Sequence, residues 1–295
     1  MRAALLEGKP LAKRIEARVA DEVRLLIEAG VTPCLCVVLV GADPASATYV
    51  RSKEKACQRV GVTSKTVTLP GSTPESELSC ILDDLNRDPT IHGILVQLPL
   101  PPAIRAEAVL CGISPSKDVD GVTPENMGKL LLGFPYTVPC TPAGIIELLD
   151  ASGISIEGKH VVIVGRSNIV GKPLAALLMQ KSKGRNCTVT ICHSKTRDVA
   201  ELTRLADVVV TAMGSPRFLT ADMVRPGCIV VDVGITRVSD PSSEKGYVLV
   251  GDADFGPLAE KASWITPVPG GVGPLTVAML LMNTVKVARY LACRP

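Results

Sequence analysis

Apolar and polar positions along the first half of the chain follow periods typical of an α/β fold. From Leu11 to Ala29 apolar residues recur at helical spacing, and Gly30 is expected to end that helix. Residues 34–41, CLCVVLVG, form a short β-rich run that predicts a strand. Further helices are predicted at 47–60 and 76–88, and further strands at 65–70 and 92–102. Strands that alternate with helices indicate a mainly parallel sheet.

The same alternation restarts in the second half. Residues 141–153 predict a helix with Thr141 as its N-cap, Pro142 at its first position and Gly153 at its end. Five strands are then predicted, at 159–165, 188–192, 206–214, 228–235 and 247–254. They indicate a second α/β unit, and the last predicted helix, 276–291, could pack back on the first half.

The length of 295 residues suits two domains. We therefore predict one domain of residues 1–145, with the C-terminal helix at 276–295 packed on it. Residues 146–275 form the second predicted domain. The predicted class is α/β, and the C-terminal domain has the Rossmann-like pattern of a dinucleotide-binding domain.

Composition narrows the class of partner. The net charge is +3 and aromatic residues make up 3%, which disfavours a nucleic-acid partner. The longest apolar run, 275–282, is too short to span a bilayer, and the N-terminus has no secretory signal pattern. We expect a cytoplasmic enzyme for anionic small molecules that binds no membrane, while an organellar presequence stays open. The ten cysteines lack zinc-site spacing, so buried free thiols and no metal site are expected.

A glycine-containing turn joins a strand to a helix in HVVIVGRSNIVGKPLAALLM, residues 160–179. Gly165 begins the turn, Ser167 occupies the place of the second glycine of a G-x-G-x-x-G fingerprint, and Gly171 follows. Such a turn lets backbone N–H groups approach a pyrophosphate at the start of the helix. The pattern predicts a dinucleotide site, although a purely structural turn has the same outline.

The residues after the next strand indicate which dinucleotide binds. An NAD site usually offers a carboxylate there for the ribose 2′-hydroxyl. This chain has HSKT at 193–196 instead, and Arg166 lies inside the turn. Cationic and hydroxyl groups suit a 2′-phosphate, so NADP is favoured over NAD. The alternative that Arg166 and Lys195 merely face solvent stays open.

Tyr49 and Lys53 have the Tyr-x-x-x-Lys spacing of short-chain dehydrogenases. Those enzymes carry the glycine-rich turn before the pair, whereas here the turn follows it by more than a hundred residues. The chain is therefore not a short-chain dehydrogenase. On a helix the two side chains share one face, and Lys55 is turned away from it.

Three further segments carry candidate site residues. Gln97 is predicted at the carboxyl end of a strand, where sites of α/β proteins open. Asp118 and Asp120 lie in a turn-like stretch, and residues 267–276, PVPGGVGPLT, form a glycine loop whose backbone could approach a ligand.

Together, seven motifs resemble the bifunctional methylenetetrahydrofolate dehydrogenase/methenyltetrahydrofolate cyclohydrolase family. They are YVRSKEKAC, GILVQLPLP, KDVDG, GRSNIVGKP, CHSKT, VVDVGI and PVPGGVGPLT. The resemblance implies two α/β domains that flank a cleft, the first for folate and catalysis and the second for NADP. It also implies a homodimer and a place in one-carbon metabolism that supports purine biosynthesis.

The resemblance assigns roles to individual residues. Lys53 matches the catalytic lysine, Gln97 the residue that tunes it, Tyr49 the side chain that stacks on folate, and Asp120 the acid that holds the pterin, with Asp118 as the fallback. Implied substrate-binding residues are Tyr49, Lys53, Gln97, Leu98, Asp120, Pro269, Gly270, Gly271 and Val272. Implied cofactor-binding residues are Gly165, Arg166, Ser167, Ile169, Ser194 and Ile235.

The implied activity is oxidation of 5,10-methylenetetrahydrofolate with NADP⁺, followed by hydrolysis of the methenyl product to 10-formyltetrahydrofolate. The second step needs a proton acceptor, and a lysine whose pKa is lowered beside the substrate cation can supply one. Two other functions remain open. One is an NADP-dependent dehydrogenase in which Lys53 polarises a carbonyl of another substrate, and the other is a non-catalytic NADP sensor.

Overall fold

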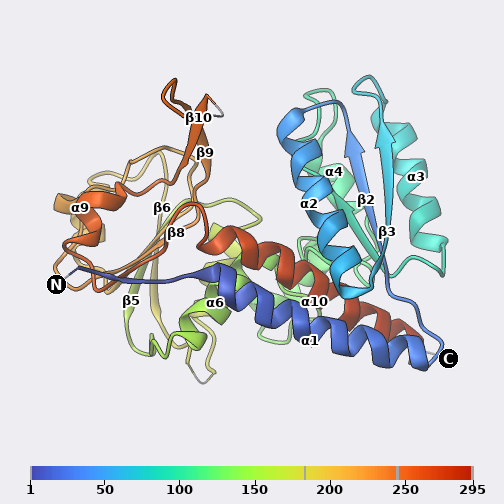
Figure 1. The fold of residues 1–295 in the computed structure, drawn as a ribbon, viewed down its shortest axis with the longest axis horizontal. Coiled ribbons are helices and arrows are strands. Elements are labelled where there is room, and N and C mark those ends of the chain that lie inside the picture. Colours follow the sequence, from blue (N-terminus) through green and yellow to red (C-terminus); the bar gives the residue numbers. More distant parts are fainter. Residues whose placement is uncertain (1, 183, 244–245, 294–295) are drawn as a thin grey trace. The chain divides into compact units, whose positions relative to one another are not determined.

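The chain folds into two units, each built around its own parallel sheet. The computed structural model describes residues 2–182, 184–243 and 246–293 (Figure 1). The three-stranded unit contains Lys13–Cys140 and Val277–Pro295, and the six-stranded unit contains Met1–Ala12 and Thr141–Thr276. The sheets of both units confirm the predicted α/β class.

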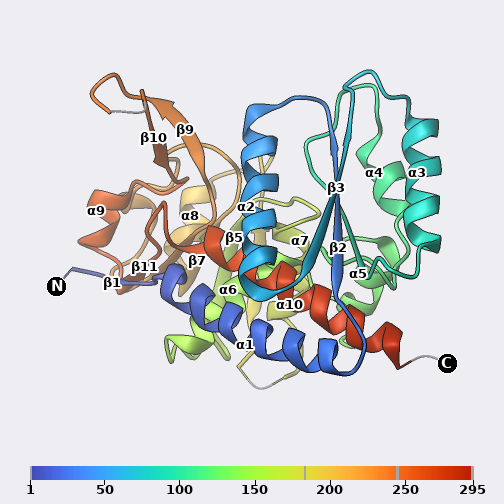
Figure 2. The same cartoon turned by 45° about the vertical axis from the view of Figure 1, so that its right-hand side comes forward.

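In the three-stranded unit the sheet order is β3-β2-β4, and both neighbouring pairs are parallel. The strands are β2 (Cys34–Val40), β3 (Thr63–Leu69) and β4 (Gly93–Val96). Figures 1 and 2 show α2 (Pro44–Val60) on one face of the sheet and α3 (Glu75–Arg87) with α4 (Ala106–Cys111) on the other. Helix α5 (Pro124–Leu131) follows the segment that contains Asp118 and Asp120.

Alternate residues of β2 supply the two faces of this sheet. Cys34, Cys36, Val38 and Val40 share one hydrophobic cluster with α3 residues such as Leu78. The residues between them are also buried, because α2 covers the other face. Burial on both faces explains why β2 reads as a continuous apolar run.

In the six-stranded unit the order is β1-β11-β8-β7-β5-β6, and every neighbouring pair is parallel. The strands are β1 (Ala4–Leu5), β5 (His160–Val164), β6 (Thr188–Cys192), β7 (Val208–Thr211), β8 (Ile229–Asp232) and β11 (Trp264–Ile265). The other elements of this unit are α6 (Cys140–Ala151), α7 (Gly171–Leu178), α8 (Val199–Arg204), the 3₁₀ turn Ala221–Met223 and α9 (Phe255–Ala259). Connections leave β5 and β7 in opposite directions, which makes this point of the sheet the usual place for a dinucleotide.

Two long helices, α1 (Gly8–Glu28) and α10 (Val272–Ala292), each contribute residues to both units. Within the described residues, α10 is the one helix long and apolar enough to cross a membrane by length and composition. More than half of its most apolar stretch is buried inside the protein, and Leu280, Leu281 and Val285 lie in the core. A buried core helix passes the same test, so α10 gives only weak support for a membrane span.

Several predicted boundaries were wrong for local reasons. Helix α2 begins at Pro44 rather than residue 47, because Asp43 caps it by accepting a hydrogen bond from the Ser46 N–H at 2.7 Å. Thr141 is not an N-cap, since α6 begins at Cys140 and the Thr141 hydroxyl pairs with that of Thr276 at 2.9 Å. The strand expected at 92–102 ends at Val96.

The expected composition of the second sheet also needs correction. The predicted strand at 247–254 is β10 (Tyr247–Val250), which pairs antiparallel with β9 (Thr236–Ser239) in a separate hairpin. The parallel sheet is instead completed by the two-residue strands β11 and β1. Residues 1–12 therefore group with the six-stranded unit, whereas the prediction placed them in the first domain. Residues 294–295 of the predicted C-terminal helix lie outside the described residues.

Candidate active site and dinucleotide turn

Lys53 and Gln97 form a direct pair at the carboxyl end of the three-stranded sheet. The Lys53 amine donates a hydrogen bond of 2.8 Å to Gln97 Oε1. Gln97 follows β4 directly; its backbone N–H donates to the Val38 carbonyl, and its amide Nε2 donates to the Leu98 carbonyl at 2.6 Å. Gln97 is thereby held at both its backbone and its side chain, and its Oε1 is presented to the lysine.

Helix α2 contains the face that the sequence predicts, with Tyr49 and Lys53 one turn apart and Lys55 turned away. Lys53 is partly buried, whereas Lys55 is exposed. Tyr49, one helical turn before Lys53, has 49% of its surface exposed, so its ring is accessible to a ligand. The sequence alone could not link this face to Gln97, which lies 44 positions further along the chain.

The pKa of Lys53 lies below the usual value for a lysine. Burial is the main cause that lowers the pKa of Lys53, and the neighbouring Asp120, Cys140 and Cys57 oppose it. The sequence predicts that a substrate cation lowers this pKa, and burial already lowers it in the protein alone. Burial also raises the pKa of Asp120, and the Lys53 ammonium acts against that rise.

The two acids of the DVDG turn have different surroundings. Asp118 is fully buried, and its carboxylate accepts hydrogen bonds from the N–H groups of Gly121 and Thr123, each at 2.8 Å. It also accepts one from Asn126 Nδ2 at 2.9 Å. Asp118 therefore shapes the turn from inside, and Asp120 is the acid whose charge acts most on the pKa of Lys53.

The backbone of the predicted dinucleotide turn is packed too tightly for side chains at two positions. Gly165 has a φ of +134°, and a β-carbon there would lie 2.2 Å from the Ala212 carbonyl oxygen. A β-carbon on Gly171 would lie 2.1 Å from the Gly165 carbonyl oxygen. The Ser167 hydroxyl accepts a hydrogen bond from the Val170 N–H at 3.1 Å, so it closes the turn where the fingerprint has glycine. This geometry brings backbone to the start of α7, as a pyrophosphate site requires.

The predicted cofactor side chains around this turn are accessible. Arg166, Ser167, Ile169 and Ser194 are exposed, and so is Ile235 after β8. Residues 193–196, directly after β6, include Ser194 and Lys195 and contain no carboxylate. Hydroxyl and cationic groups at this position fit the 2′-phosphate of NADP. The described residues therefore fit the predicted cofactor.

Two buried carboxylates that the sequence analysis did not single out hold the loops beside this turn. Asp232 accepts hydrogen bonds from the N–H groups of Gly234, Asp252 and Ala253 and from the Thr211 hydroxyl, at 2.9–3.0 Å. Asp252 accepts two from the N–H groups of residues 213 and 214 after β7, at 2.8 and 3.0 Å. Burial raises the pKa of Asp232 to about 6, and the hydrogen bonds that its carboxylate accepts from Ala253, Asp252 and Thr211 oppose that rise. The pair fixes the backbone that presents Ile235.

The predicted glycine loop at 267–276 is only partly a loop, because α10 begins at Val272. Pro269 is exposed and Gly270 has a φ of +115°, whereas Gly271 and Val272 are buried. The Gly270 carbonyl accepts hydrogen bonds from the N–H groups of Gly8 and Lys9. Pro269 and Gly270 can therefore meet a ligand directly, but the side chain of Val272, 3% exposed, lies in the core.

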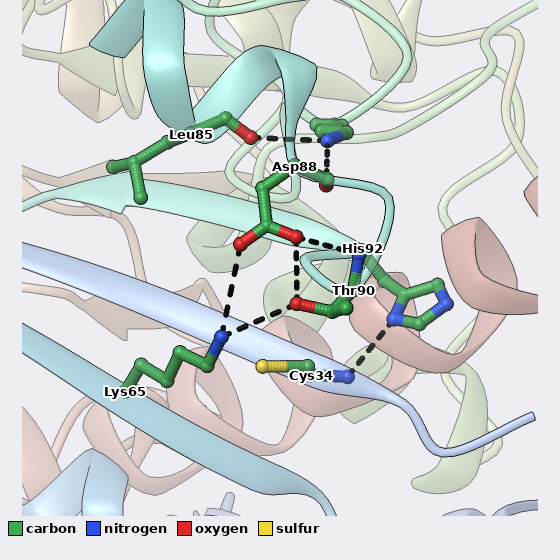
Figure 3. Close-up of polar contacts among 7 residues, drawn as sticks. Cys34, Lys65, Leu85, Asp88, Thr90 and His92 are labelled. Carbon is green, nitrogen blue, oxygen red and sulfur yellow. Dashed lines mark hydrogen bonds and ion pairs between the residues drawn. The ribbon is translucent and has the colours of Figure 1, made fainter. Parts of the chain in front are cut away.

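A cavity of about 620 Å³ lies at the opposite, amino end of the three-stranded sheet. Figure 3 shows polar contacts in this region: the Lys65 amine lies between Asp88 and Thr90, and His92 Nδ1 accepts a hydrogen bond from the Cys34 N–H at 3.2 Å. The polar groups in this region therefore already have hydrogen-bond or ion-pair partners within the protein. Sites of α/β proteins open at the carboxyl ends of their strands, so we place the candidate site at Lys53 rather than in this cavity.

Comparisons with known proteins agree with this geometry. The family model described as "Tetrahydrofolate dehydrogenase/cyclohydrolase, catalytic domain" matches residues 6–120, and its companion "NAD(P)-binding domain" matches residues 139–292. The chain is 51% identical to the bifunctional protein FolD of Chlorobium phaeobacteroides, with 97% of this chain and 98% of that one covered.

Solved structures give the same result. The bifunctional enzyme FolD from Campylobacter jejuni is 47% identical, with a TM-score of 0.92 and 98% of this chain and 99% of that one covered. The Trypanosoma brucei methylenetetrahydrofolate dehydrogenase-cyclohydrolase, solved with NADP cofactor and an inhibitor, is 41% identical, with a TM-score of 0.94 and both chains fully covered. The chain belongs to the tetrahydrofolate dehydrogenase/cyclohydrolase family.

Proposed function

We propose that the protein oxidises 5,10-methylenetetrahydrofolate to 5,10-methenyltetrahydrofolate with NADP⁺ and hydrolyses that product to 10-formyltetrahydrofolate. The observation that carries this proposal is the Lys53 amine, hydrogen-bonded to Gln97 and facing Asp120, within the region matched by the catalytic-domain model. A dehydrogenase that only transfers hydride has no need of such a base.

In the first reaction NADP⁺ accepts a hydride from the one-carbon bridge, and the product is a methenyl cation. No proton moves in this step, so the task of the protein is to position the reactants. Gly165, Arg166, Ser167, Ile169, Ser194 and Ile235 would hold the cofactor. Among them Arg166 and Ser194 would contact the 2′-phosphate, and backbone at the turn would meet the pyrophosphate.

In the second reaction water adds to the one-carbon centre of the cation and its proton leaves. The neutral Lys53 amine accepts that proton, and Gln97 Oε1 keeps the amine oriented for it. The C–N5 bond of the resulting hydroxy adduct then breaks while its hydroxyl loses the second water proton and N5 takes up a proton, so that the C=O of 10-formyltetrahydrofolate forms. Asp120 holds the amino edge of the pterin, and the accessible Tyr49 ring stacks on the folate. Leu98, Pro269, Gly270, Gly271 and Val272 complete the proposed substrate residues, with Gly271 and Val272 acting through the backbone.

Changing Lys53 to Met tests the second step. Loss of a proton acceptor typically costs about 10²–10⁴-fold in rate, so Lys53→Met should accumulate methenyltetrahydrofolate, visible by its absorbance, while some dehydrogenase activity remains. The control is Lys55→Met on the exposed side of α2, which should accumulate none. Hydrolysis of methenyltetrahydrofolate by Lys53→Met at the wild-type rate would refute this mechanism.

We further propose that the protein is a cytoplasmic homodimer that acts in one-carbon metabolism and purine biosynthesis, without a nucleic-acid or membrane partner. Family membership and the small net charge of +3 support this proposal.

A further inference from the structure

The segment that carries Asp120 lies directly against the segment that leads into α6. Gly121 has a φ of +71°, and a β-carbon there would lie 2.8 Å from both the Pro139 nitrogen and the Val138 carbonyl carbon. No side chain fits between the two backbones. Whatever fixes Val138–Cys140 therefore also fixes the turn that presents Asp120.

Asn283 on α10 ties these two segments together. It is 6% exposed, and its Nδ2 donates a hydrogen bond of 2.8 Å to the Val119 carbonyl and one of 2.9 Å to the Val138 carbonyl. Both N–H bonds of the amide are thus used on the backbone. One of the two acceptors, the Val119 carbonyl, directly precedes Asp120. The Asn283 amide therefore fixes the position of the backbone that enters Asp120.

The Cys140 thiol lies at the same junction. It is 2% exposed and donates to the Val119 carbonyl at 3.5 Å, and Asn283 Nδ2 is 3.7 Å from its sulfur. The thiol is also a hydrogen-bonding neighbour of the Asp120 carboxyl group. Burial raises the pKa of Cys140 well above the usual thiol range, so the group stays protonated and acts as a donor.

We propose that Asn283 and Cys140 are positioning residues of the active site, which hold the Asp120 carboxylate in place beside Lys53. This inference rests on the proposed function. It assigns Asn283 and Cys140 no contact with substrate, so both residues act only through Asp120. Asn283 acts on the backbone before Asp120, and Cys140 acts through its single S–H, which is shared between the Val119 carbonyl and the Asp120 carboxylate.

The charged groups around Lys53 and Asp120 mean that this positioning role should be visible in the pH dependence of the hydrolysis rate. Lys53, Asp118 and Cys140 face Asp120, and Asp120, Cys140 and Cys57 face Lys53. Without the thiol donor the Asp120 carboxylate is less stabilised, so the Lys53 ammonium loses part of its counter-charge and its pKa falls further. Hydrolysis requires neutral Lys53, so its rate rises with pH up to that pKa. In a variant without the thiol, the rising part of the pH–rate profile of hydrolysis (its pH limb) should therefore move to lower pH.

The test compares Cys140→Ala with Cys140→Ser and Asn283→Leu, by measuring kcat and KM for methenyltetrahydrofolate hydrolysis across pH. A misplacement of about 1 Å can cost roughly 10²-fold in rate, so Cys140→Ala and Asn283→Leu should lose about 10- to 100-fold in kcat/KM. The pH limb of Cys140→Ala should shift to lower pH. Cys140→Ser, whose hydroxyl can still donate, should keep most of the rate and the wild-type limb.

Matched controls separate positioning from loss of stability. Cys36→Ala removes a fully buried thiol from β2 of the same unit, and Thr284→Val removes a buried hydroxyl that bonds only to the Leu280 carbonyl of its own helix. Both should lower the temperature of unfolding and leave the hydrolysis rate of the folded enzyme and its pH limb unchanged.

A wild-type rate and pH limb in Cys140→Ala would overturn the inference, as would equal losses in the controls. Should Asn283→Leu fail to fold, the Ala and Ser variants of Cys140 decide the question. Absence of hydrolysis in the wild-type enzyme would instead refute the proposed function, so the two failures are distinguishable.

Discussion

The candidate site at Lys53 and the dinucleotide turn at 165–171 are built in opposite ways. The first gathers side chains from α2, the end of β4, the DVDG turn and the start of α6, and they are partly or fully buried. The second is a continuous stretch whose backbone is tightly packed and whose side chains at 166–169 are exposed. Substitutions in the first region should therefore alter chemistry or stability, whereas exposed side chains in the second should alter only which cofactor binds.

The largest effect within this comparison is expected for cofactor choice. Replacing Arg166 and Ser194 together by Ala removes the two groups proposed to contact the 2′-phosphate. Charge-assisted contacts contribute about 1.5–3 kcal/mol each, so the Kd for NADP⁺ should rise far more than that for NAD⁺. Titration with both cofactors checks this, and the temperature of unfolding without cofactor should stay unchanged. Equal losses for the two cofactors would show that the phosphate binds elsewhere.

A smaller effect should separate the two acids of the DVDG turn. Asp118→Asn places an amide among three donors, and an unsatisfied buried group costs about 1–3 kcal/mol, so chemical unfolding should show a loss of stability. Asp120→Asn should unfold near the wild-type midpoint but impair both reactions, because we propose that this acid orients the pterin for each. The assignment would have to be reversed if Asp120→Asn were the less stable protein and Asp118→Asn the less active one.

The smallest effect is expected at the amino end of the same sheet. Lys65 lies 3.8 Å from Asp88, and its side chain is 49% exposed. Exposed pairs of this kind contribute little, so Lys65→Met should leave both reactions and the unfolding midpoint within experimental error. A clear loss of hydrolysis would mean that the site extends through the sheet and would break the contrast drawn here.

The sequence predicted most of what depends on neighbouring residues. The α/β alternation, the turn after β5 and the shared face of Tyr49 and Lys53 are local patterns, and the structure contains all three. The predicted start of α2 is three residues late, because Asp43 is an N-cap that the apolar pattern does not reveal.

What the sequence could not predict depends on pairing across long separations. Strands of two residues, such as β1 and β11, have no detectable period. Asn283 lies in an apolar helix, where one polar residue gives no indication of its partners 145 and 164 positions away. The division of roles between Asp118 and Asp120 likewise emerges only from the donors around each carboxylate.

The pairing of β1 with β11 has a consequence for synthesis on the ribosome. Ala4 and Leu5 emerge early, yet their partners Trp264 and Ile265 are added some 260 positions later. Likewise, residues 13–140 must wait for the part of α10 that supplies Asn283. Neither unit can reach its final hydrogen-bonding pattern while the nascent chain is half made, so both must be completed after nearly all of the polypeptide has been translated.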